Sequence, residues 1–208
     1  MTEFNSRGRA AFATGLARAL GLLALLLLAA CGGAAAGAGK PSPVTVERLY
    51  PLRPGSVWTY DVDTGEGLPV LAITRVLSAE GGKVEVSSGS DGLHYEPRPE
   101  GLMRSDVGSY LLRAPLSVGN SWQGQQGAQV EITRVDATAS TPAGEFVNCL
   151  ETVESAGPSE KRVRTVFCPD VGPVEIESSL HIQLTGKSTR VIARLRGYDF
   201  SGAAMAAQ

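Results

Sequence analysis

The pattern of hydrophobic and polar positions after residue 43 is that of short β-strands. In residues 58–62 (WTYDV) apolar and polar side chains alternate, which is typical of a strand with one apolar face. No segment of this region repeats its apolar residues every 3.6 positions over three helical turns. We expect strands at residues 44–49 (an edge strand), 58–62, 68–77, 83–87, 93–96, 101–105, 109–113, 130–136, 146–154, 162–168, 174–178, 180–185 and 189–198.

Short, turn-rich connections between these segments favour antiparallel hairpins. Residues 54–55 (PG) and 141–144 (TPAG) are turn sequences. Roughly 10 to 13 sequential strands would leave open edges unless the sheet curls on itself. The predicted fold class is therefore all-β and mainly antiparallel, as a barrel, a half-barrel or a sandwich.

Two internal repeats divide the predicted β region into related halves. PLRPGSVW at residues 51–58 returns as PLSVGNSW at residues 115–122, with four identities at a spacing of 64. ITRV at residues 73–76 returns at residues 132–135, at a spacing of 59. We expect one β domain at residues 44–200, built from unit one (44–113) and unit two (114–200), and a disordered tail at residues 201–208.

Residues 1–30 have the composition of an export signal. Arg7, Arg9 and Arg18 accompany an apolar run of 12 residues at positions 19–30. That run is shorter than the about 20 residues that a membrane-spanning helix needs, so we predict a signal peptide. Its removal leaves 16 basic and 20 acidic residues, a net charge of −4. The remaining chain has no basic patch that would indicate binding to nucleic acid.

The end of the apolar run, LAAC at residues 28–31, resembles the signal of bacterial lipoproteins. The resemblance implies lipid on the Cys31 thiol, cleavage before Cys31 and acylation of the new amino terminus, a stable membrane anchor. Gly32 in place of Asp implies the outer membrane, with the domain facing the periplasm or the cell surface. Residues 31–43 would be the lipidated cysteine and a flexible linker. Alternatively, Cys31 is an ordinary residue at the end of a secretory signal or a signal anchor.

Cys149 and Cys168 are the two cysteines of the predicted β domain. If their segments form a hairpin symmetric about the bond between residues 158 and 159, the two cysteines lie opposite each other on neighbouring strands. Opposed Cα atoms can be about 4.5 Å apart, within disulfide range, and an exported protein meets an oxidising compartment. We therefore predict a disulfide; the alternative is two buried free thiols.

Few residues suggest catalysis or metal binding. His94 and His181 have no cysteine or second histidine at ligand spacing, and motifs such as G-x-S-x-G are missing from the sequence. The loop at residues 61–67 (DVDTGEG) carries three carboxylates, which suits a solvated turn or weak calcium binding. We predict a non-enzymatic domain without a cofactor or a metal.

Trp58 and Trp122, one in each repeat, allow two interpretations. In the first, they fill the two ends of the core. In the second, they line a concave apolar surface together with Tyr60 and Leu71, and this surface receives a lipid, another apolar ligand or a partner protein.

Unit two resembles a loose group of exported bacterial proteins with domains of unknown function. The resemblance is carried by PLSVGNSW, by TPAGEF at residues 141–146 with Cys149 nearby, and by VGPV at residues 171–174; Asp170 stands where the group has glycine. These motifs imply turns and strand ends, and no catalytic residue comes with them.

Three hypotheses about function follow. The first is a non-catalytic lipoprotein that acts as a binding or envelope-assembly module. The second is a carrier or receptor for a lipid or another apolar ligand. The third is an envelope hydrolase, which would need a polar cleft that contains His94 or His181.

Overall fold

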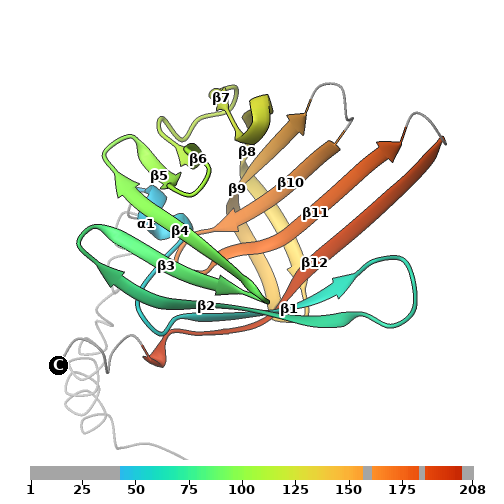
Figure 1. Cartoon of the computed structure of the whole chain (residues 1–208), viewed down its shortest axis with the longest axis horizontal. Coiled ribbons are helices and arrows are strands. Elements are labelled where there is room, and N and C mark those ends of the chain that lie inside the picture. Colours follow the sequence, from blue (N-terminus) through green and yellow to red (C-terminus); the bar gives the residue numbers. More distant parts are fainter. Residues whose placement is uncertain (1–42, 157–160, 183–185, 203–208) are drawn as a thin grey trace, which may run out of the picture. The chain divides into compact units, whose positions relative to one another are not determined.

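The computed structural model describes residues 43–156, 161–182 and 186–202, which form one antiparallel sheet of twelve strands (Figure 1). The elements are α1 (Val46–Leu49), β1 (Val57–Asp63), β2 (Val70–Glu80), β3 (Lys83–Ser88), β4 (Asp91–Arg98), β5 (Gly101–Arg104), β6 (Ser109–Arg113), β7 (Ser121–Gln123), the 3-10 turn η1 (Gln125–Gly127), β8 (Gln129–Thr141), β9 (Gly144–Ala156), β10 (Lys161–Cys168), β11 (Gly172–Ile182) and β12 (Lys187–Asp199).

The predicted signal peptide, Cys31 and the linker up to residue 42 lie outside the described residues. Of the predicted tail, Ser201 and Gly202 are helical, and residues 203–208 lie outside the described residues. Residues 174–178 and 180–182, from two predicted strands, belong to one continuous strand, β11, and residues 183–185 of the second prediction lie outside the described residues.

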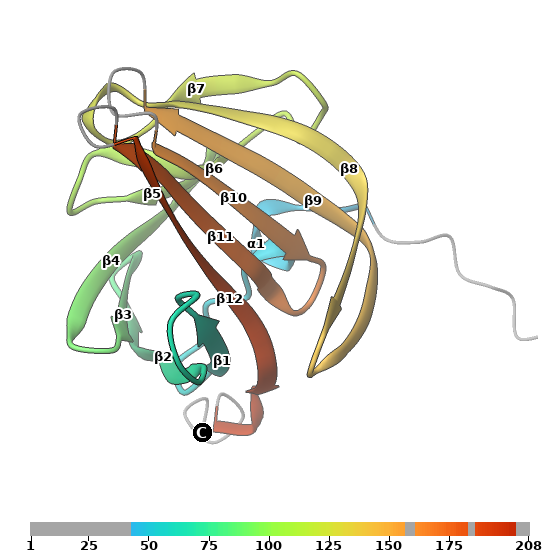
Figure 2. The same ribbon diagram turned by 90° about the vertical axis from the view of Figure 1, so that its right-hand side faces the viewer.

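Each strand of the sheet pairs with the next strand along the chain, except that β6 does not pair with β7. The order is β6-β5-β4-β3-β2-β1-β12-β11-β10-β9-β8-β7, so β1 pairs with β12 in the middle and β6 and β7 are the edges. The sheet curls until these two edges come together, which makes a nearly closed barrel (Figure 2). The predicted all-β antiparallel class is confirmed, and the barrel is the right choice among its three forms.

The two halves of the sequence contribute six strands each, β1–β6 and β7–β12, within one compact unit. The glycine of the repeated PLxxGxxW motif makes the same contact in both halves. Gly55 N donates to Val76 O at 3.0 Å, and Gly119 N donates to Ile132 O at 2.9 Å. Both glycines have positive φ angles, 82° and 84°, which glycine adopts without strain. Val76 ends the first ITRV sequence and Ile132 begins the second, so the ITRV copies are not structurally equivalent.

Residues 44–49 were expected to form an edge strand, and this prediction is wrong because residues 46–49 form the helical turn α1. Thr45 caps it, since its Oγ1 accepts a hydrogen bond from Arg48 N at 3.4 Å. A single turn is too short to show a helical period in the sequence. α1 lies inside the curl of the sheet (Figure 2) and buries Leu49 in the core.

An aromatic layer fills the barrel beside α1. Tyr50 packs edge-on against Trp58 and Tyr95, with ring centroids 5.3 and 5.8 Å away, and lies 6.5 Å from the ring of Phe167. These rings come from the segment after α1 and from strands of both halves, so the closed end of the barrel is a single core.

The β9–β10 hairpin has the predicted register. Lys161 pairs with Ala156 and Phe167 pairs with Leu150, which is symmetry about the bond between residues 158 and 159. Cys149 and Cys168 therefore meet, and they form a disulfide with their Cα atoms 4.3 Å apart. The predicted disulfide is confirmed.

Candidate functional site

Three of the four side chains that were predicted as ligand-binding candidates belong to the core. Trp58 is fully buried and its Nε1 donates to Val171 O at 2.6 Å. Tyr60 is buried too, and its hydroxyl donates to Pro173 O at 2.8 Å. Both rings therefore hold the β10–β11 turn in place, and their polar atoms already have partners.

Trp122 is the third buried candidate, and Leu71 is the exposed one. Trp122 is buried, and its Nε1 donates to Tyr110 O at 2.8 Å, which links β7 to β6 across the barrel seam. Leu71 is 55% exposed and lies on the outer face of β2, since the neighbouring Ala72 pairs with the inward-facing Tyr60. The four residues do not line one surface, and the core interpretation of the two tryptophans is the correct one.

Beyond the aromatic layer, the inner wall of the barrel is left partly open. Residues paired across an antiparallel sheet share a face, and one inward row crosses five strands through Thr152, Thr165, Ile176, Ala193 and Val62. Except for Thr152, these side chains are only half-buried. The wall they form is mainly apolar, with two threonine hydroxyls at one end.

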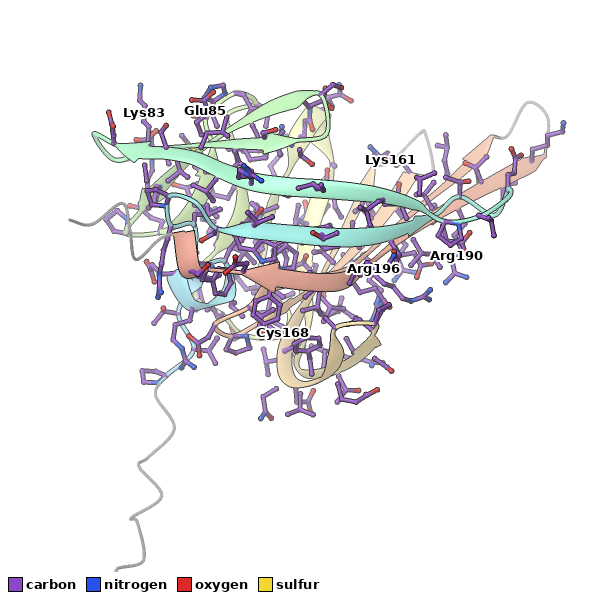
Figure 3. All side chains as sticks on the ribbon, turned by 90° about the horizontal axis from the view of Figure 1, so that it is seen from below. Lys83, Glu85, Lys161, Cys168, Arg190 and Arg196 are labelled. Atoms are coloured by element: carbon purple, nitrogen blue, oxygen red, sulfur yellow. A yellow bond between two sulfur atoms is a disulfide. The ribbon has the colours of Figure 1, made fainter. Side chains whose placement is uncertain are left out.

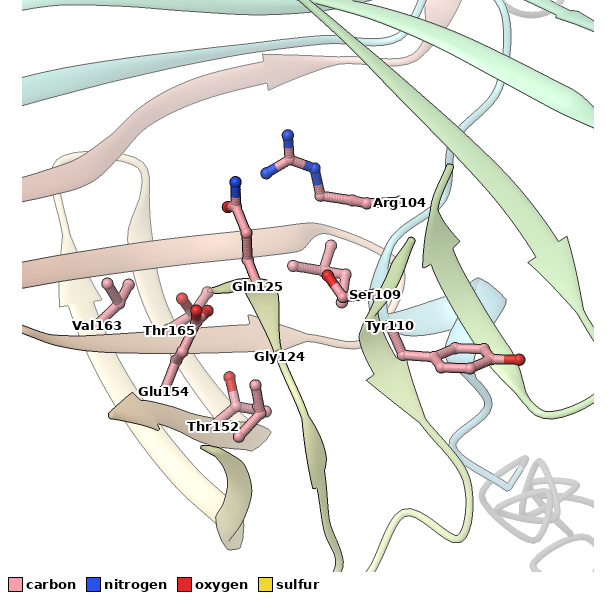
Figure 4. Close-up of a pocket in the computed structure, with 11 residues that line it drawn as sticks. Arg104, Ser109, Tyr110, Gly124, Gln125, Thr152, Glu154, Val163 and Thr165 are labelled. Carbon is pink, nitrogen blue, oxygen red and sulfur yellow. The ribbon is translucent and has the colours of Figure 1, made fainter. Parts of the chain in front are cut away.

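At that end, next to the seam, lies a cleft of about 60 Å³ between β5–β6 and β9–β10 (Figure 4). We call it the seam cleft. It is lined among others by Arg104, Ser109, Thr152, Glu154, Val163 and Thr165. In this cleft, polar side chains from several strands converge beside an apolar wall, a combination that is common in ligand sites.

Of the two charged side chains that line the seam cleft, Arg104 has an ion-pair partner and Glu154 has none among the described residues. Arg104 Nη2 lies 2.5 Å from Asp106 Oδ2, and its Nε donates to Asp106 Oδ1 at 3.3 Å. Burial tends to raise the pKa of Asp106, but the hydrogen bond from Arg104 outweighs it and holds the pKa below its usual value. In the part of the chain that the structure describes, the Glu154 carboxylate makes no hydrogen bond or ion pair.

An ionic network covers the outer face of the same wall. Arg164 bridges Glu151 (2.7 Å) and Glu175 (2.5 Å), and Glu175 also pairs with Arg194 (3.2 Å). Pairs between Arg190 and Glu177 and between Arg196 and Asp61 extend it over β11, β12 and β1 (Figure 3). Sequence patterns alone did not predict this network, although opposite charges do occur at alternate positions of successive strands.

Glu151 is the most buried member of this network, 7% exposed. Its Oε1 accepts a hydrogen bond from Thr133 Oγ1 at 2.7 Å. Burial tends to raise the pKa of Glu151, but the hydrogen bonds from Thr133 and Arg164 outweigh it, and the pKa lies below its usual value. The network is therefore a structural feature, since its charges satisfy one another.

The outer face of β2 carries exposed apolar side chains. Leu71, Ile73 and Leu77 are 55%, 46% and 52% exposed, with Arg75 among them, and they line a shallow hollow. The inward positions of β2 include Ala72, Thr74 and Val76, so both faces of the strand carry apolar side chains. Contiguous exposed apolar side chains commonly mark a contact surface.

Neither the histidines nor the acidic loop lines the seam cleft, although His94 is near enough to Asp106 to help lower the pKa of that carboxyl group. His94 pairs with Glu85 on the outer face of β4, and His181 Nδ1 lies 3.0 Å from Ser188 Oγ. Asp63 Oδ1 accepts a hydrogen bond from Gly65 N at 2.8 Å, as in an Asx turn. In the described part of the chain, no three His, Cys, Asp or Glu side chains gather to hold a metal ion. No helix there has the length and hydrophobicity to span a membrane.

Two solved structures are similar to this chain. One is a protein described as exported, with a YmcC-like fold, from Bacteroides fragilis; it is 14% identical, covers 71% of this chain and 97% of its own, and has a TM-score of 0.43. The other is described as a lipoprotein from Parabacteroides distasonis; it is 13% identical, covers 73% of this chain and 98% of its own, and also has a TM-score of 0.43. No family model and no curated protein matches the chain. We therefore infer function from its own residues.

Proposed function

We propose that this protein is a lipid-anchored component of a bacterial cell envelope whose β-barrel is a non-catalytic binding module. The LAAC sequence at residues 28–31 supports the anchor through Cys31. The β domain begins 12 residues later, so a linker of at most about 40 Å would keep it near the membrane. We place it at the outer membrane, on the periplasmic side or at the cell surface.

The observation that carries the binding role is the partly open inner wall. Ile176, Ala193 and Val62 face inward yet remain half-buried, whereas the other end of the barrel is filled by the aromatic layer. Apolar side chains left accessible inside a barrel favour an apolar or amphipathic ligand. The module would thus act as a carrier or receptor for such a ligand.

The positions of the candidate catalytic groups favour binding over hydrolysis. His94 and His181 do not line the seam cleft, and the cleft hydroxyl of Ser109 has no histidine beside it among the lining residues. A serine without a neighbouring base is a weak nucleophile. The hydrolase hypothesis therefore has no support from the arrangement of these side chains.

Native mass spectrometry tests the binding role. The chain from Pro43 onward forms one compact unit that contains the core and the disulfide, and we would purify it gently from its native host. We expect a bound small mass that is lost on denaturation. Ala193→Trp should abolish it by filling the open wall, while the matched change Val147→Trp on an exposed site should not. A bare chain mass in every preparation would contradict the proposal.

The exposed side chains on β2 favour a second candidate, contact with another envelope protein during assembly. A photo-crosslinking residue in place of Ile73 should then capture a defined partner in intact cells. The same residue in place of Val147, which is also exposed, serves as the control. Equal labelling from both positions would count against a specific contact at β2.

A further inference from the structure

We propose that the seam cleft binds the primary ammonium group of an amphipathic amine, with Glu154 as its counter-ion. This inference rests on the proposed function, since it assigns the ligand class of the open barrel. It is carried by three features of the cleft, namely its charge, its unpaired hydroxyls and its apolar wall.

The charge of the cleft favours a cation. Arg104 is already engaged by Asp106 through two contacts and is also close enough to Glu154 to interact with it electrostatically. Two carboxylates therefore stand against one guanidinium in this group, which leaves a net negative charge. Lys161, the next inward position after Val163 on β10, is exposed at the rim and forms no ion pair within the described residues. An anionic ligand would be repelled by the Glu154 carboxylate, because the Arg104 guanidinium is already paired with Asp106 and cannot offset that charge.

The hydroxyl groups beside Glu154 suit an ammonium donor. Thr152 is only 5% exposed and Thr165 is half-buried, and neither side chain makes a hydrogen bond in the described structure. Both face the cleft that Glu154 also lines (Figure 4). Neither oxygen is sealed from solvent, since among the described residues Ser56 Oγ is the one enclosed side-chain oxygen without a partner, so both hydroxyls can accept a hydrogen bond from a group in the cleft. A primary ammonium group has three donors, which match one carboxylate and two hydroxyl acceptors.

The wall of the cleft suits an alkyl stem. Val130 and Val163 line the cleft, and the inward row continues from Thr165 to Ile176 and Ala193 along half-buried apolar positions. A cleft of about 60 Å³ has room for an ammonium group and a short piece of stem. The rest of an apolar tail would lie along the inward row.

Gly124 keeps the space beside the carboxylate open. A Cβ atom at this position would lie 2.8 Å from Val130 Cγ2 and 3.4 Å from Glu154 Oε1. The glycine is required by this close approach, because any side chain would push into the cleft wall.

Isothermal titration of the chain from Pro43 onward with three eight-carbon probes tests the inference. Octylamine carries an ammonium group at neutral pH, octanol is neutral and octanoate is anionic. We expect octylamine to bind about tenfold or more tightly than octanol, and octanoate to bind weakest. Glu154→Gln should remove this preference, while the matched change Glu131→Gln on an exposed position of β8 should keep it. Thr165→Val gives a second variant that should weaken octylamine several-fold.

The outcomes separate the inference from the proposed function. Equal binding of octylamine and octanol that is unchanged in Glu154→Gln would overturn the ammonium site and leave the barrel as an apolar binding site. No binding of any probe would overturn both. Binding of N-acetyl-lysine methylamide as tight as that of octylamine would replace the amphipathic amine with a lysine side chain of a partner protein.

Discussion

Arg48 and Asp170 form a two-point ion pair that fastens α1 to the β10–β11 turn. Arg48 Nε donates to Asp170 Oδ1 at 2.9 Å, and Nη2 lies 2.5 Å from Oδ2. Asp170 N also donates to Arg48 O at 2.6 Å. Asp170 has a φ of 64°, a conformation that aspartate tolerates better than most residues. Its side chain therefore has a structural role at this turn.

Asp170→Asn should lower the thermal unfolding midpoint at pH 7, because it keeps the shape of the side chain and removes its charge. The hydrogen bond from Arg48 lowers the pKa of Asp170. Its stabilising effect is therefore present above the unfolded-state pKa of about 3.9 and is lost as the pH falls through the lower folded-state pKa. Thermal scans of both proteins between pH 7 and pH 2 should converge at the acid end. A constant difference at all pH values would contradict the ion-pair explanation.

Removal of the disulfide by Cys149→Ser together with Cys168→Ser should lower the free energy of unfolding by about 3 kcal/mol, because the bond restrains the unfolded chain. The two cysteines are 19 residues apart in the sequence. Urea unfolding of the chain from Pro43 onward measures the change. Treatment of the parent protein with a reductant should lower its free energy of unfolding by the same amount. If the reductant also lowers the stability of the double variant, the loss does not come from the disulfide.

Trp122→Phe should loosen the seam of the barrel. The change removes the indole donor to Tyr110 O and leaves that carbonyl without this partner. The free energy of unfolding should therefore fall by about 1–3 kcal/mol. Hydrogen exchange should become faster in β6 in particular. Trp58→Phe is the matched control, since its indole donates to Val171 O near the β10–β11 turn; equal effects of both variants on β6 would argue against a specific role of Trp122.

Glu151→Gln should destabilise the protein at pH 7 by about 2 kcal/mol, because it removes a buried charge partner of Arg164 while Glu175 remains. The pKa of Glu151 is lowered in the folded protein, so its contribution is present above pH about 4.5 and is lost as the pH falls through the folded-state pKa. In urea unfolding, the free energy of unfolding of the variant should be clearly lower than that of the parent at pH 7 and close to it at pH 3. Glu177→Gln, in a more exposed pair, should have a much smaller effect at pH 7.

Local sequence was sufficient wherever neighbouring segments decide the structure. The alternation at residues 58–62 predicts a strand with one buried face, and the symmetric hairpin predicts that Cys149 meets Cys168, because adjacent strands pair through the nearest turn. The same reasoning failed at residues 46–49, since a single helical turn leaves no period in the sequence. Local pattern also placed two strands where β11 is continuous.

What the sequence by itself determined is the class of fold and the cysteine pair, and the export signal that ends at Cys31 stays a prediction. Tertiary structure alone decided which apolar residues are covered. Tyr60 and Leu71 are large apolar side chains on the paired strands β1 and β2, yet Tyr60 is buried and Leu71 is 55% exposed, because they lie on opposite faces of the curled sheet. The seam cleft also depends on closure, because Arg104 and Glu154 come from strands that meet only when β6 approaches β7. Such contacts are set by the curvature of the whole sheet, which no short stretch of sequence encodes.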